Sequence, residues 1–219
     1  MATDPLAGTD LARIPMPDDV YGFGWAEMRY LLGRHDTPSA RTAVAALGFG
    51  AAPTDDLVPA AGIASLMARG LVAPEGDRGI SRGEAAVLET VFARGVRWSG
   101  MSFRTDGDEG DLLVAIEDGD IIALLQPRSF GTWFVGLTNE VDTPAAAVGR
   151  AVGAMLEVRG EGRFAIETRT LDAVVGARFF RPDGDGWLVS DSAQGETRRI
   201  DRTALEAELA VLLPGRPTA

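Results

Sequence analysis

The chain has 219 residues, of which 46% are hydrophobic and 24% are charged, and its formal net charge is −11. This composition is typical of a folded globular protein, while so acidic a chain is poorly suited to nucleic-acid backbones, which are bound through lysine and arginine. The chain has no cysteine and no lysine, and His35 is its single histidine. Disulfides, thiolate catalysis and lysine Schiff bases are therefore excluded, and few side chains exchange protons near neutral pH.

The two ends of the chain have the composition of flexible segments. Residues 1–17 contain three prolines among small and acidic residues, and residues 214–219 are similar, so we expect a flexible arm and a flexible tail. The beginning of the sequence lacks the basic and apolar regions of a signal peptide, and no apolar run reaches the roughly 18 residues of a membrane span. We therefore expect a cytoplasmic protein without membrane interactions.

Residues 18–95 have a helical pattern. Apolar residues recur at helical spacing, Thr37 before Pro38 is a favourable helix start, and Ser81 begins a sequence with capping-box spacing. We expect helices over residues 18–34, 37–47, 59–69 and 81–94, with a short extended piece at 71–74. These elements together resemble a small winged-helix arrangement.

From residue 96 the pattern changes to that of strands. Two Asp-Gly segments, at residues 117–120 and 183–186, are typical of hairpin turns. We expect strands over residues 98–104, 112–116, 121–125, 132–137, 164–170, 174–180, 187–190 and 197–200, and helices over 143–158 and 203–213. A group of strands followed by one helix thus occurs twice. We predict an α+β fold in which the helical part precedes two pseudo-repeated antiparallel sheet-plus-helix units, residues 96–158 and 159–213.

This order of elements, with the segment LMARGLV at residues 66–72, resembles the EspG family, the cytosolic chaperones of type VII (ESX) secretion in actinobacteria. The resemblance covers roughly residues 18–213, although the chain is shorter than typical members. It implies a non-catalytic role without a cofactor, in which a face of the central sheet, with adjacent loops and helices, holds the hydrophobic tip of a helical secreted partner until export.

One segment has the composition of a binding surface. Interfaces favour aromatic residues and arginine, so we predict Arg128, Phe130, Trp133 and Phe134 as partner-binding residues if their strand has an open face. The alternative is burial in the core, which is the commoner environment of strand aromatics. The tryptophans of the expected strands are Trp98, Trp133 and Trp187.

Three polar clusters have structural interpretations that we prefer. The acidic run at residues 106–111 partly matches a calcium-binding EF-hand loop, but Asp111 stands where that loop requires glycine, so we expect a solvated hairpin loop and no metal. His35 is expected to stabilise the end of a helix. The arginines of the only tight basic cluster, Arg198, Arg199 and Arg202, are expected to form surface ion pairs.

Two other functions stay open at this stage. A transcriptional regulator would use residues 37–80 as a DNA-binding winged helix, with a local basic face formed by Arg34, Arg41, Arg69 and Arg78, and the rest of the chain as a sensor. A hydrolase would have to use carboxylates alone, and no motif organises them, so we do not expect an enzyme. The sequence does not identify the partner or the oligomeric state.

Overall fold

A computed structural model describes residues 20–50, 56–76, 78–105, 111–119, 121–138, 143–160 and 162–214. The expected arm at residues 1–17 and nearly all of the expected tail lie outside these ranges. Among the described residues, no helix combines the length and apolar character needed to cross a membrane, and the longest, α5, has 16 residues.

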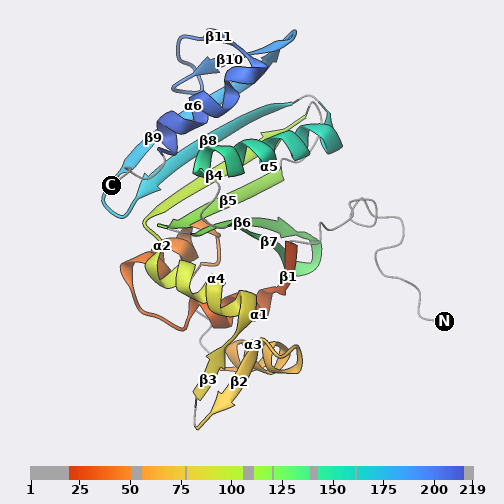
Figure 1. Ribbon diagram of the computed structural model, residues 1–219, viewed down its shortest axis with the longest axis vertical. Helices are drawn as coiled ribbons and strands as arrows, with labels where there is room; N and C mark the ends of the chain where they lie inside the picture. The colour runs from red at the N-terminus through yellow and green to blue at the C-terminus, as the bar shows by residue number, and fades with distance from the viewer. Residues whose placement is uncertain are drawn as a thin grey trace, which may run out of the picture.

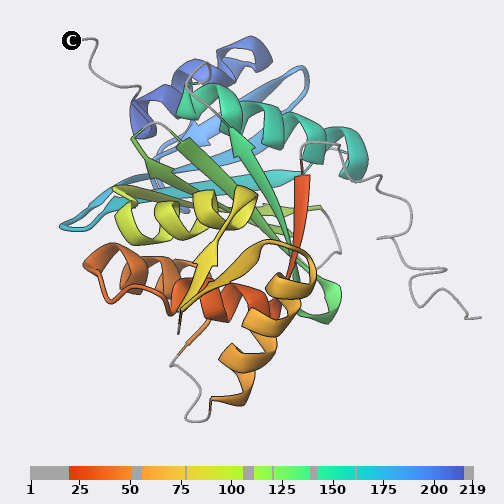
Figure 2. The same ribbon diagram turned by 60° about the horizontal axis from the view of Figure 1, so that its bottom comes forward.

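The centre of the fold is one sheet of nine strands, in which every neighbouring pair is antiparallel. The strand order is β1-β7-β6-β5-β4-β8-β9-β10-β11. The strands are β1 (Val20–Gly24), β4 (Arg97–Arg104), β5 (Asp111–Asp118), β6 (Ile121–Arg128), β7 (Thr132–Thr138), β8 (Arg163–Thr170), β9 (Val174–Asp183), β10 (Gly186–Ser190) and β11 (Arg198–Asp201). The predicted α+β class is confirmed, since helices flank this sheet on both sides (Figure 2).

The sheet contains the same order of elements twice. Strands β4 to β7 are followed by α5 (Pro144–Arg159), and strands β8 to β11 by a short 3-10 turn and α6 (Leu205–Leu212). The first strands of the two units, β4 and β8, pair antiparallel at the centre, and α5 and α6 pack against each other on the same side of the sheet (Figure 1). The two sequence units thus join through equivalent strands.

The part of the chain before β4 contains four helices and a hairpin. They are α1 (Trp25–Leu32), α2 (Pro38–Ala46), α3 (Leu57–Ala68), the hairpin of β2 (Val72–Glu75) and β3 (Arg78–Ser81), and α4 (Gly83–Arg94). The predicted helix over 18–34 is wrong at its start, because Val20–Gly24 is the edge strand β1, which pairs with β7. Gly22 and Gly24 disfavour a helix there, and the pairing with β7 supplies the backbone hydrogen bonds.

Local capping signals explain two helix starts and fail at a third. The hydroxyls of Thr37 and Thr143 accept hydrogen bonds from the backbone N–H groups of Ala40 and Ala146, which lie in the first turns of α2 and α5. Ser81 does not cap α4, because it is the last residue of β3 and its hydroxyl donates to a Glu89 carboxylate oxygen instead. Helix α4 therefore begins after Arg82, without a side-chain cap.

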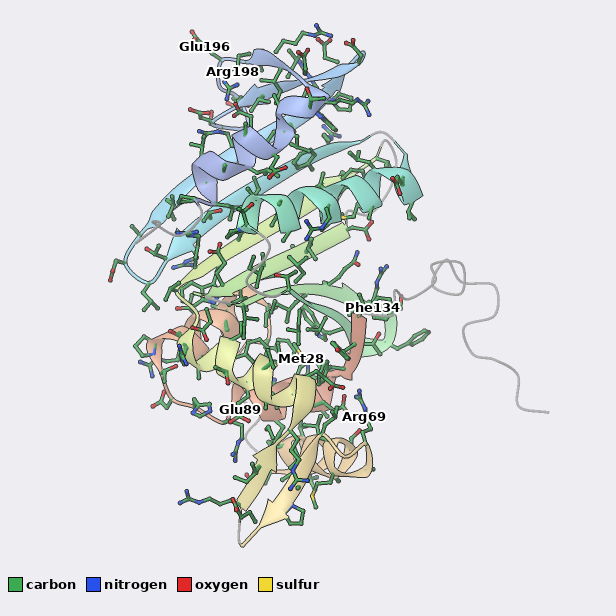
Figure 3. The ribbon with its side chains drawn as sticks, in the orientation of Figure 1. Met28, Arg69, Glu89, Phe134, Glu196 and Arg198 are labelled. Atoms are coloured by element: carbon green, nitrogen blue, oxygen red, sulfur yellow. The ribbon has the colours of Figure 1, made fainter. Side chains whose placement is uncertain are left out.

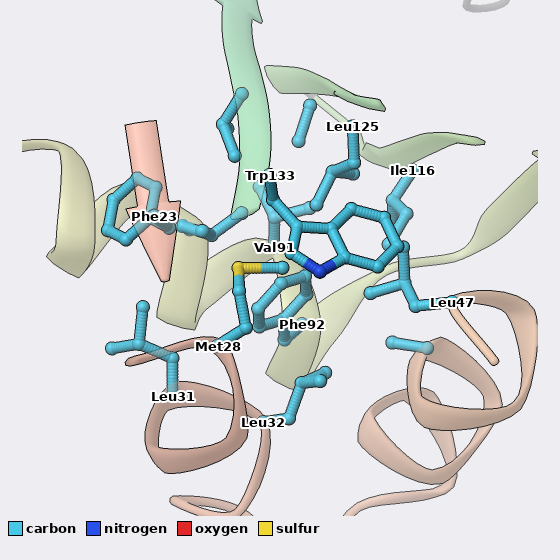
Figure 4. Close-up of a cluster of buried hydrophobic side chains, with 14 of the residues drawn as sticks. Phe23, Met28, Leu31, Leu32, Leu47, Val91, Phe92, Ile116, Leu125 and Trp133 are labelled. Atoms are coloured by element: carbon cyan, nitrogen blue, oxygen red, sulfur yellow. The ribbon is translucent and has the colours of Figure 1, made fainter. Parts of the chain in front are cut away.

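Two apolar clusters cover opposite faces of the sheet. The first fills the space between α1, α2 and α4 and strands β1, β4, β5, β6 and β7, where Trp133 lies beside Met28 and Phe92 (Figure 4). The second lies between α5, α6 and strands β4, β5, β6, β8, β9 and β10, and includes the stacked rings of Phe164 and Phe180. The expectation that the strand tryptophans are core residues is confirmed for Trp98, Trp133 and Trp187.

Candidate protein-binding surface

The segment predicted to bind a partner forms the turn between β6 and β7. Phe130 lies in the middle of this turn with its side chain in solvent, at 78% exposure. Its backbone is left-handed, with φ 61° and ψ 24°, and among the described residues every other positive φ belongs to a glycine. A left-handed conformation is unfavourable for a residue with a Cβ atom. Neither packing against the described residues nor local backbone preference therefore explains this exposed ring.

Arg128 and Phe134 lie together beside this turn. The Arg128 guanidinium is 4.7 Å from the centre of the Phe134 ring, and its Nη2 donates a 2.7 Å hydrogen bond to Gln126 Oε1. Gln126 and Phe134 are directly paired across β6 and β7, so their side chains point to the same face. We call Arg128, Phe130 and Phe134 the aromatic tip.

Trp133 does not belong to this surface. Its side chain points to the opposite face of β7 from Phe134, is only 6% exposed, and stacks on Phe49 with 5.4 Å between ring centres. Phe49 stacks in turn on Trp25, at 6.3 Å, and the Cβ of Trp25 lies against the turn at Gly131. The predicted group of four residues is thus corrected to three, with Trp133 as the inner support of the turn.

A second surface, which the sequence analysis missed, lies on strands β4, β5, β8, β9 and β10. It continues the face that the N-terminal helices cover on the first unit. Gly100 and Ser102 lie on the same side of β4 as the buried Trp98, because side chains alternate along a strand. Direct cross-strand pairing places one row of side chains here: Leu112, Ser102, Ala165, Phe179 and Ser190. We call this surface the open face.

The open face is apolar at its centre and is not covered by a described helix. Phe179, Ala165 and Ala177 are half-buried, and Leu112 at its border is 40% exposed. Helices α5 and α6 lie on the other face, and the apolar cluster that contains the N-terminal helices has no member from β8 to β11. The duplicated units therefore differ, since this face is covered in the first and open in the second.

The largest charged clusters have structural roles. The buried Glu27 carboxylate accepts hydrogen bonds from Gly24 N–H at 2.8 Å, Ser65 Oγ at 2.6 Å and Arg69 Nη1 at 2.8 Å, which ties α1 to α3. The predicted surface ion pairs of the basic cluster are confirmed for Arg198 and Arg199. Their partners are Glu208 for Arg198, and Asp183 and Asp185 for Arg199.

His35 is held by a carboxylate and not by a nucleophile. Its Nε2 lies 2.8 Å from Glu89 Oε1, and the other oxygen of Glu89 accepts the Ser81 hydroxyl. The carboxylate thus lies between the imidazole and the hydroxyl, whereas a serine nucleophile requires the imidazole to contact the hydroxyl directly. Residues 106–110 lie outside the described residues, but strands β4 and β5 flank them, so the helices of an EF-hand are absent on either side.

Three of the four arginines proposed as a DNA-binding face have acidic partners among the described residues, and Arg78 has none (Figure 3 labels Arg69 and Glu89 in this part of the chain). Arg34 bonds to Glu89, Arg41 to Asp36, and Arg69 to Glu27. The three carboxylates neutralise most of the local positive charge that a phosphate backbone would require.

Comparisons with known proteins do not assign this fold to a family: no protein-family model matches the chain, and no curated protein matches its sequence.

Proposed function

We propose that this protein is a non-catalytic binding protein that shields an apolar helical segment of a protein partner, as the EspG-family chaperones do. The observation that carries the proposal is the open face. No helix of the described residues covers the apolar centre around Phe179, whereas the corresponding face of the first unit is buried under helices. The sheet-face recognition that the family resemblance implies supports the same surface.

The shape and chemistry of the open face fit a helix. Gly100, Ser102, Ala165 and Ala177 are small, so a helix can approach the strands closely, and Phe179 supplies one large apolar contact. Burial of a phenylalanine side chain contributes roughly 1.5–3 kcal/mol, and small neighbours let it become fully buried. The aromatic tip, with its exposed Phe130, lies at the other end of the sheet, and its Phe134 points to the opposite face from the open face, so it is a separate candidate contact.

The biological setting of the proposal comes from the resemblance alone. It comprises a cytoplasmic location, a helical secreted partner of a type VII system and an actinobacterial host. The chemistry of the surface supports a protein partner whatever the setting, because aromatic and apolar groups without a reactive constellation favour binding over catalysis.

Co-purification from the native host tests the proposal. We expect the tagged protein to retain a small helical partner, and Phe179→Asp to lose it, because a carboxylate at the centre of the contact would have to be desolvated. Val211→Asp is the matched control, since Val211 is an exposed apolar residue on α6, away from the open face. Phe179→Ser is the milder variant should Phe179→Asp fail to fold, as judged by thermal unfolding. Retention of the same partner by both Phe179 variants, or no partner for the wild type, would refute the proposal.

A further inference from the structure

Four arginines border the apolar centre of the open face. Arg104 and Arg163 are directly opposite each other across β4 and β8. Arg181 follows Phe179 by two residues on β9, which places both on the same face, and Arg169 lies at the far end of β8. All four are exposed. A ligand on the apolar centre would therefore have Arg104, Arg163 and Arg181 along one flank, whereas on the other flank Glu167 lies between the centre and Arg169.

None of these arginines forms an ion pair with a carboxylate of the described residues. Glu167 lies on the same face, opposite Gly100 and Ala177, and has no ion-pair partner there either. Elsewhere Arg199 bonds to Asp183, and on the opposite face of β9, Arg178 lies 3.2 Å from Asp191. Arg78 and Arg82 also lack an ion pair with the described residues, but on the open face two such arginines, Arg104 and Arg163, lie directly opposite each other.

This arrangement is unfavourable for the chain alone. Like charges directly opposite on neighbouring strands destabilise a sheet, and Arg104 faces Arg163 in this way. The chain has 32 acidic residues against 21 basic ones, so unpaired arginines are not forced by its composition. An anionic ligand would remove the repulsion.

We infer that the partner segment bound by the open face carries carboxylates along one flank of its apolar stripe, the flank that meets Arg104, Arg163 and Arg181. This inference rests on the proposed function, because it assigns the chemistry of the partner at that same surface. An acidic amphipathic helix would place its apolar side chains on Phe179 and Ala165, and its flanking glutamates or aspartates on Arg104, Arg163 and Arg181. Arginine is suited to this role because its guanidinium binds carboxylates through two parallel hydrogen bonds.

Charge and shape favour this occupant over two others. A nucleic acid would match the arginines but not the apolar centre, and the net charge of −11 repels a long polyanion. A second copy of the chain, docked open face to open face, would bring arginine against arginine. A short acidic peptide satisfies both the arginines and the apolar row.

Two synthetic peptides test the inference. Both are 18-residue amphipathic helices with the same leucine and alanine face, one flanked by glutamate and the other by lysine. Fluorescence anisotropy with the full chain measures their affinities in low and moderate salt. We expect the glutamate peptide to bind about tenfold more tightly, the sum of two or three exposed ion pairs, with an advantage that shrinks as salt screens the charges. In Arg163→Gln/Arg181→Gln the preference should fall to about twofold or less, whereas Arg150→Gln, on α5, should keep it.

The outcomes separate the inference from the proposed function. Equal affinities for the two peptides, both abolished by Phe179→Asp, would overturn the acidic partner and leave the binding function standing. The inference and the proposed function would both be overturned if neither peptide binds with a Kd below about 100 µM, or if Phe179→Asp leaves the binding unchanged.

Discussion

The left-handed backbone at Phe130 makes a prediction that separates stability from binding. Phe130→Gly removes the steric cost of φ 61°, which is roughly 1–2 kcal/mol for a residue with a Cβ atom, and adds roughly 0.5–1 kcal/mol of chain entropy to the unfolded state. Phe130→Ala keeps the Cβ atom and hence the strain. Since the phenylalanine ring is 78% exposed, both variants lose little buried area. We therefore expect the glycine variant to be more stable than the alanine variant by about 0.5–1 kcal/mol.

Urea unfolding at 25 °C measures this difference, and thermal unfolding should place the glycine variant a few degrees higher, about 1–4 °C. If Phe130 contacts a partner, both variants should weaken partner retention equally although only one gains stability. A glycine variant no more stable than the alanine variant would show that the turn carries no strain. The backbone at Phe130 would then give no support to a partner contact at this turn.

Three further predictions concern the packing and the buried charges. Gly62→Ala should lose about 2 kcal/mol despite the better helix propensity of alanine, because its Cβ would lie 2.1 Å from the Ala26 carbonyl oxygen. Gly153→Ala in α5, with open space around the added Cβ, should gain about 0.5–1 kcal/mol in the same urea assay, and a gain at both sites would contradict the close packing of α1 on α3. Glu27→Ala should cost about 2–4 kcal/mol, since three donors lose their acceptor, and a change below about 1 kcal/mol would show that water replaces it. Burial raises the pKa of Glu117 above 4.5, against the lowering effect of Arg97. The protonated carboxyl is therefore favoured in the folded state, and its contribution to folding stability is fully present below pH 4.5 and is lost as pH rises through the folded pKa. The wild type should therefore lose stability relative to Glu117→Gln as pH rises above 4.5, and a difference that does not change with pH would refute this assignment.

Local signals in the sequence predicted most of the elements after residue 96. The threonine cap at Thr143 and the Asp-Gly turn at residues 183–186 act within a few residues, so they are visible without the fold. The repeated order of strands and helix followed from the same signals. Strand β1 was missed because its hydrogen bonds come from β7, more than 100 residues later in the chain, and no local pattern carries that information.

The candidate site was only partly predictable. The exposure of Phe130 agreed with the composition of its segment, but Trp133 and Phe134 are neighbours on a strand and so face opposite sides of the sheet. That alternation alone could have separated them. The open face had a weaker signal in β8, where Arg163, Glu167 and Arg169 alternate with the buried Phe164 and Ile166. Its uncovered state depends on where the N-terminal helices end, which the sequence does not show.

The unequal covering of the two units has a consequence for stoichiometry. A duplicated sheet with equivalent faces would offer two docking positions related by symmetry, and would crosslink its ligands. Here α1, α2 and α4 pack on one of those positions, and the described residues leave the other open, so the proposed function predicts one docking position on this side of the sheet. A partner bound there would form a one-to-one complex, which could not grow into larger assemblies through the same contact.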